Sequence, residues 1–190
     1  TAERMEALYN AIVVIFSWPA YGGPVVSGTA SYLSDKKDAR ASCDALNTCI
    51  QKIDTYHRLL TEGWQKRLWK KAVRKFPDNL SAAQGYFAEL LGEDCKVSLN
   101  LLCNSLRNYL LKKSVLATRN APAKNHVFDN IALVAADANN EGHKEWVESL
   151  DARRVYVVIN ENDYALSFSR LKPGDQQRPR LGHWLKNLTA

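Results

Sequence analysis

Two kinds of hydrophobic pattern alternate along this chain. Continuous apolar runs rich in Val, Ile and Leu are typical of strands buried on both faces of a parallel sheet, and they cover residues 11–18, 96–103, 128–137 and 153–163. Between them, apolar residues recur every three or four positions, which predicts helices over residues 38–60, 105–116 and 143–150. The alternation predicts an α/β fold with a mostly parallel sheet and helices on both faces.

Residues 61–92 interrupt this alternation and predict a helical insertion within a single domain that spans residues 1–190. An apolar stripe marks the first helix of the insertion and consists of Leu68, Trp69, Ala72, Val73 and Phe76. Pro77 and Asp78 end that helix, and a second helix is predicted from about Ser81 to Leu91.

The hydrophobic fraction of 46% is sufficient for a buried core, and no stretch is long and apolar enough to predict a transmembrane helix. The first residues lack the pattern of a secretory signal, so we expect a cytoplasmic protein, although the chain does not begin with Met. The four cysteines form no C-x-x-C pair and the four histidines no i, i+4 pair. We therefore expect reduced thiols, no metal site and no cofactor.

The net charge of +6 comes from one segment, residues 66–75, which contains six basic residues and no acidic one. These are Lys66, Arg67, Lys70, Lys71, Arg74 and Lys75. Basic residues interleaved with Trp64 and Trp69 are of the kind that bind nucleic acid or an anionic membrane surface. A solvated helix face is the commoner explanation of such a pattern, and no nucleic acid is clearly indicated.

Polar residues follow the predicted strands, at the sheet end where parallel sheets gather their functional groups. The first is Ser105, which we expect in a turn between a central strand and a helix, with a positive φ. A serine in such a turn can act as a nucleophile, and the backbone N–H of the next residue, Leu106, helps to bind an oxyanion. The order Ser105, Asp163, His183 is the order of nucleophile, acid and base in α/β hydrolases. Asp137 is the alternative acid.

Two aromatic residues near the end of the first predicted strand are candidates for lining an acyl pocket. Trp18 ends the strand and Tyr21 lies in the glycine-rich loop that follows. A role for Trp18 in covering the core explains its position equally well. A histidine in such a context more commonly packs against its neighbours than acts in catalysis, because Trp184 and Leu185 directly follow His183.

Four segments of the chain resemble a family of uncharacterised bacterial α/β hydrolases: VVIFSWPAYGG, LNLLCNSLRNYLL, NIALVAADANNEGH and VYVVINENDYALSFSRLK. The nucleophile segment of that family usually reads like C-H-S-M-G-N. The resemblance places its Cys, Ser and Asn on Cys103, Ser105 and Asn108. Asn104 and Arg107 stand where the family has His and Gly.

The resemblance implies a serine hydrolase, similar to an esterase or lipase, that acts on an ester or other acyl substrate with its acid at Asp163. It also implies a strand before residue 11, a second oxyanion donor after that strand, and a catalytic His beyond residue 190. The 190-residue chain alone is therefore expected to hydrolyse esters poorly. Two alternatives stay open: a catalytically degenerate interaction module, and an anion-binding protein that uses residues 66–75.

Overall fold

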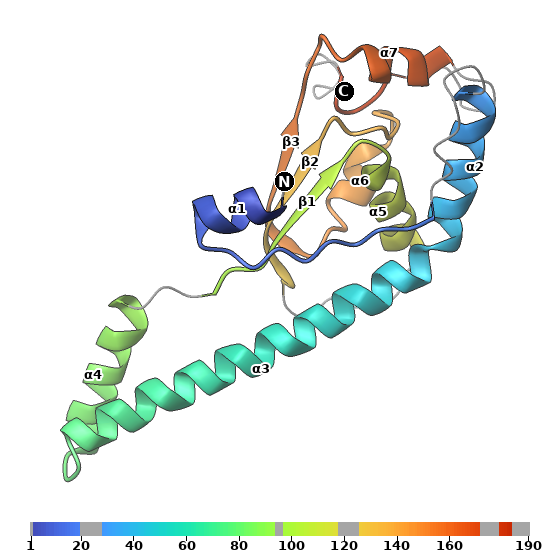
Figure 1. Cartoon of the computed structure of the whole chain (residues 1–190). Helices are drawn as coiled ribbons and strands as arrows, with labels where there is room; N and C mark the ends of the chain where they lie inside the picture. Colours follow the sequence, from blue (N-terminus) through green and yellow to red (C-terminus); the bar gives the residue numbers. More distant parts are fainter. Residues whose placement is uncertain (1, 20–27, 94–96, 118–125, 172–178, 184–190) are drawn as a thin grey trace.

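The computed structural model describes residues 2–19, 28–93, 97–117, 126–171 and 179–183. In these residues three strands form an all-parallel open sheet in the order β1 (Asn100–Asn104), β2 (Phe128–Val134) and β3 (Ala152–Val158). The helices α5 (Leu106–Ala117), α6 (His143–Val147) and α7 (Tyr164–Leu171) follow the three strands in turn (Figure 1). The chain is therefore an α/β protein, as the alternating pattern predicts.

One face of the sheet carries the core. In register across the strands, this face has two rows of apolar residues: Leu101, Ile131 and Val155, then Cys103, Leu133 and Val157. The helices α5 and α6 pack on these rows, with Leu111 and Trp146 buried. On the opposite face, Leu102 and Tyr156 are exposed. Helices on both faces, as expected from the pattern, are thus not confirmed by the described residues.

The prediction of a strand over residues 11–18 is wrong, because residues 11–19 form an extended segment without strand pairing. Ile12 is 91% exposed, whereas Phe16 and Trp18 pack against α2 (Gly28–Ala41), α3 and α5. An apolar run becomes a strand only where a neighbouring strand satisfies its backbone N–H and C=O groups. None of the three described strands pairs with this segment. The helix α1 (Ala2–Tyr9) precedes it.

The helices predicted on both sides of residue 60 form one helix, α3 (Cys43–Lys75), of 33 residues, which is about 50 Å long at 1.5 Å per residue. Its first turns pack on the rest of the molecule through Cys43 and Leu46. Its last turns pack on α4 (Leu80–Glu93), where the rings of Trp69 and Phe87 lie edge to face with their centres 5.4 Å apart. Residues 61–92 are thus helical as predicted, but the first predicted helix is the end of α3 and only α4 is a separate helix. We call residues 61–93 the arm, because they project from the sheet (Figure 1).

No helix among the described residues is long and apolar enough to cross a membrane.

Candidate functional site

Ser105 occupies the turn between β1 and α5, and its side chain is exposed. Its φ of 53° lies in the left-handed region, which costs free energy for any residue other than glycine. The prediction of a positive-φ turn at Ser105 is confirmed. However, β1 is an edge strand of the described sheet, and β2 is the central one.

The buried side chain of Asn108 holds this turn in place. Its Nδ2 group lies 2.9 Å from the carbonyl oxygen of Ser105, 3.1 Å from that of Val134 and 3.3 Å from that of Cys103. In addition, the backbone N–H of Ser105 donates to the Val134 carbonyl at 3.0 Å. The turn is therefore anchored to β2 as well as to β1, and these bonds offset the strain at Ser105.

The N-terminus of α5 lies directly after Ser105, so its first N–H groups are close to the serine. The first N–H groups of a helix have no acceptor within the helix, and the helix dipole favours negative charge there. The N–H of Leu106, the predicted oxyanion donor, is the first of them. Arg107 does not prevent the turn, because its side chain is exposed and its Cζ lies 5.7 Å from the centre of the Trp18 ring. Tyr21 lies outside the described residues.

Asp137, the alternative acid, lies beside the serine turn, since its backbone N–H is 3.4 Å from the Ser105 carbonyl oxygen. Its carboxylate is buried. One carboxylate oxygen, Oδ1, accepts a hydrogen bond of 2.5 Å from Ser169 and lies 3.2 Å from Nε of Arg180. Arg180 is only 2% exposed and also donates to Asn139 and to the carbonyl of Ser169. This buried ion pair joins α7 and residues 179–183 to the turn after β2.

The other two predicted site residues both lie near the N-terminus of α7, and Ser167 stands between them. Asp163 caps this helix, because its Oδ1 accepts the N–H of Leu166 at 3.1 Å. The buried ring of His183 places Nε2 3.1 Å from the hydroxyl of Ser167, which in turn lies 3.4 Å from the carbonyl oxygen of Asp163. The hydrogen bond shown for this ring is therefore to Ser167, and not to Ser105. No local sequence pattern predicts a role for Ser167, because its partner His183 lies in a different segment of the chain.

The segment that carries His183 is fixed at the same end of the sheet as Ser105. Gly182 donates its N–H to the Ala136 carbonyl at 3.2 Å, directly after β2. A Cβ added to Gly182 would lie only 2.1 Å from the backbone nitrogen of Ala136. The carbonyl of Gly182 accepts the N–H of Asn160, just after β3, at 3.0 Å. Ser105 follows β1 and Asp163 follows β3 in a parallel sheet, so both residues lie at the same end of the sheet.

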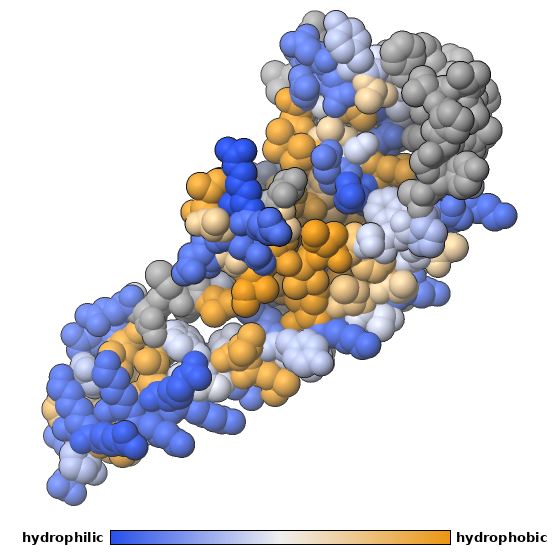
Figure 2. Space-filling model, viewed as in Figure 1, coloured by the Kyte–Doolittle hydropathy of each residue, from blue (hydrophilic) through white to orange (hydrophobic). Residues whose placement is uncertain are grey.

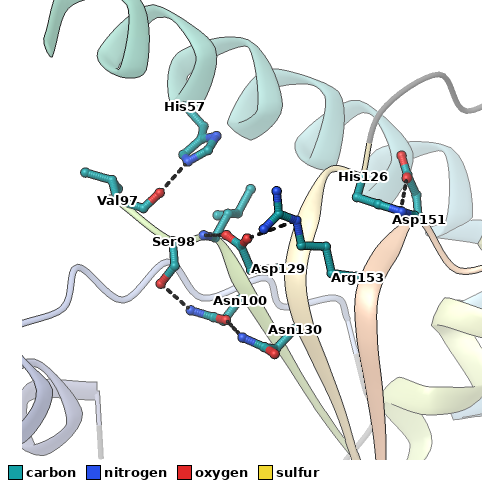
Figure 3. A network of polar contacts seen from close by, with 10 residues as sticks. His57, Val97, Ser98, Asn100, His126, Asp129, Asn130, Asp151 and Arg153 are labelled. Carbon is teal, nitrogen blue, oxygen red and sulfur yellow. Dashed lines mark hydrogen bonds and ion pairs between the residues drawn. The ribbon is translucent and has the colours of Figure 1, made fainter. Parts of the chain in front are cut away.

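A second polar group lies at the opposite, N-terminal end of the strands (Figure 3). His57 of α3 bonds the carbonyl of Val97 at 2.9 Å, and Asn130 donates to Asn100, its partner in register, at 2.7 Å. Three further pairs continue the group: Asn100 with Ser98, Asp129 with Arg153, and His126 with Asp151. The members of the group are exposed or half-buried and join neighbouring strands, so we assign them a structural role.

Burial raises the pKa of the Cys103 thiol to about 12, although the charge of Arg107 acts in the opposite direction. The neutral thiol is a poor nucleophile, so Ser105 is the better candidate of the two. Within the described part of the chain, no group of three or more His, Cys, Asp or Glu side chains could hold a metal ion.

Comparison with known proteins gives no relative: no family model, no curated protein and no solved structure matches this chain.

Proposed function

We propose that this chain belongs to a serine hydrolase of the α/β-hydrolase type, in which Ser105 attacks an ester or other acyl carbon. One observation carries the proposal: an exposed serine with a φ of 53° joins a parallel strand to a helix. Backbone strain of this kind concentrates at functional sites, where the surrounding structure supports it. Here Asn108 supplies that support through three carbonyl contacts.

The reaction would proceed through an acyl-enzyme. The Ser105 hydroxyl adds to the acyl carbon while an imidazole takes its proton, and the carbonyl oxygen becomes an oxyanion that the N–H of Leu106 stabilises. One such donor is worth roughly 3 kcal/mol in the transition state. The imidazolium then protonates the leaving group, and water hydrolyses the acyl-enzyme by the same steps in reverse order.

His183 and Asp163 are the candidate base and acid for this reaction. For His183 to act as base, its ring must exchange the hydroxyl of Ser167 for that of Ser105. The resemblance would instead supply a histidine beyond residue 190. In either case Asp163 would orient the imidazole, as the acid does in a hydrolase triad.

A catalytically degenerate, hydrolase-like interaction module is the second candidate. The carboxylate of Asp163 already caps α7, and that of Asp137 already binds Ser169 and Arg180. Each of the two candidate acids thus has a structural role that would constrain its carboxylate even without catalysis. This arrangement favours binding over catalysis.

Labelling with a serine-reactive fluorophosphonate separates the two candidates. We would treat the 190-residue chain, and the longest natural chain that contains it, and locate the label by peptide mass spectrometry. A hydrolase is expected to carry the label on Ser105, weakly in the 190-residue chain and strongly in the longer one. The label should disappear in Ser105→Ala and persist in Ser167→Ala, the matched control.

Two results would change the account. A label on Ser167 would make the Ser167 and His183 pair the reactive group. No label in the longest natural chain would favour the interaction module. Loss of labelling in His183→Ala, with the fold retained, would identify His183 as the base.

A further inference from the structure

The outward side of α3 in the arm carries a stripe of four cations. Arg67, Lys70, Lys71 and Arg74 are spaced i, i+3, i+4 and i+7, so they share one helix face. All four side chains are exposed, and they line a shallow surface hollow of about 320 Å³. The opposite side of the helix packs on α4 through Trp69 and the fully buried Ala72.

Among the described residues, these four cations have no acidic partner. By contrast, the neighbouring Lys75 is engaged, because its ammonium lies 3.7 Å from the centre of the Tyr86 ring. Like charges held within one or two helical turns repel each other, so the stripe lowers the stability of the free helix. Binding of an anionic partner would relieve this repulsion.

Exposed apolar side chains continue the same face toward the N-terminus of α3. Tyr56, Leu60, Arg67 and Arg74 follow one another at intervals of four, seven and seven residues, which keeps them on one side of the helix. Tyr56, Leu59 and Leu60 are 66%, 58% and 62% exposed. In Figure 1, α3 forms the lower edge of the molecule.

The apolar part of this face contains a hollow nearer the N-terminus of α3. This mainly apolar hollow of about 600 Å³ is lined by Val14, Ala45, Thr48, Cys49, Lys52, Ile53 and Tyr56. Figure 2 shows hydrophilic residues over the far end of the arm and hydrophobic residues between the arm and the sheet. One face of α3 thus changes along its length from apolar to basic.

We propose that this face of α3 docks on an anionic membrane surface. Cations contact acidic lipid headgroups, while exposed apolar side chains enter the interface beside them. Nucleic acid would use the cations, but its phosphate backbone gives Leu59 and Leu60 no favourable environment. The inference does not depend on Ser105.

Co-sedimentation of the full 190-residue chain with vesicles tests the proposal. We expect binding to phosphatidylcholine vesicles that contain phosphatidylserine, weakening as salt is added, and little binding to phosphatidylcholine alone. The main variant reverses the stripe: Arg67→Glu, Lys70→Glu, Lys71→Glu and Arg74→Glu. Since each cation near the surface contributes roughly a fivefold factor, we expect the variant to bind at least ~100-fold more weakly.

A matched control separates the stripe from net charge. It reverses four exposed cations elsewhere and therefore has the same net charge: Arg4→Glu, Lys37→Glu, Lys144→Glu and Arg154→Glu. We expect it to bind at least ~10-fold more tightly than the stripe variant. The double variant Leu59→Ser and Leu60→Ser should bind phosphatidylserine vesicles about tenfold more weakly than the original chain. Circular dichroism checks that each variant keeps its helices.

Three outcomes would overturn the proposal. The first is no binding of the original chain to phosphatidylserine vesicles. The second is an equal loss in the stripe variant and its matched control, which would show that only net charge matters. The third is tighter binding to duplex or single-stranded nucleic acid, with no effect of the leucine substitutions, which would assign the face to nucleic acid.

Discussion

The sheet with α5–α7 and the arm bury different kinds of side chain. Around the sheet, fully or nearly fully buried positions include Asn108, Asp137 and Arg180, each with polar partners. In the arm, the buried side chains are Ala72, Ala83 and Leu90. A buried polar group destabilises the fold when it loses its partner, so the positions of these side chains around the sheet are tightly constrained. The arm, by contrast, is held together by a small apolar contact.

This difference indicates where each kind of function can reside. A nucleophile needs a fixed turn, and the bonds of Asn108 supply one around Ser105. A docking surface needs exposed charge on a stable support, and α3 supplies that in the arm. Substitutions matched between the two regions can therefore test the comparison.

The largest effect is expected when the buried ion pair near the sheet is broken. Asp137→Asn removes the carboxylate charge that lies 3.2 Å from Nε of Arg180, a residue that is 2% exposed. Breaking a buried pair by removing one partner typically costs about 3–5 kcal/mol. We therefore expect the free energy of unfolding, measured in a denaturant titration, to fall by about that amount.

Asp54→Asn on α3 is the matched control for this change. Asp54 pairs with Arg58 at 3.1 Å, and the arginine side chain is 65% exposed. An exposed i, i+4 pair contributes only about 0.3–0.5 kcal/mol, so the control should be almost neutral. Equal effects of the two substitutions would contradict the distinction between a buried ion pair beside the sheet and an exposed ion pair on α3.

A second test compares two glycines. In Gly182→Ala, the new Cβ would meet the Ala136 nitrogen at 2.1 Å, so the backbone must move and weaken the bonds around it. We expect a loss of about 3 kcal/mol in the free energy of unfolding, at the upper end for overpacking. Gly85→Ala in α4 has open space at its Cβ and should instead gain up to about 1 kcal/mol. A neutral Gly182→Ala would show that this close approach is absent in solution.

A smaller effect is expected from pH. Burial raises the pKa of Cys103 from 9.0 to about 12 in the folded chain, so between these values the unfolded chain loses its proton first. The folded state therefore holds more protons, and its stability falls as pH rises from 9 toward 12. The titration of this thiol should make the free energy of unfolding roughly 1.4 kcal/mol lower at pH 10 than at pH 8.

The pH effect can be isolated by difference, because other groups also titrate in this range. Denaturant titrations at pH 8 and pH 10 would compare the original chain with Cys103→Val. The free energy of unfolding of the variant should fall less between the two pH values than that of the original chain. An identical loss in both proteins would mean that Cys103 is accessible to solvent.

Much of the fold could be predicted from sequence because the signals were local. The apolar runs of β2 and β3 and the periodicity of α5 lie within single segments. The strand predicted at residues 11–18 failed because a strand depends on a partner that the segment itself does not specify. The strand predicted over residues 153–163 is too long, because β3 ends at Val158 and Asp163 caps α7, which begins at Tyr164.

The candidate site divides in the same way. The turn at Ser105 could be predicted because the strand, the serine and the helix are consecutive in sequence. The pairing of Asp137 with Arg180, and that of Ser167 with His183, join residues far apart in the chain. No local pattern reports such contacts, because they depend on how residues 179–183 pack on the turn after β2.

Trapping an acyl-enzyme tests the central claim most directly. The longest natural chain that contains these 190 residues would be mixed with an aryl ester, quenched in acid within the first turnover, and digested for peptide mass spectrometry. The account predicts one acyl group on the peptide that contains Ser105, and none on that peptide in Ser105→Ala. Release of the aryl alcohol with no acyl group on Ser105, or an acyl group on Ser167 instead, would contradict it.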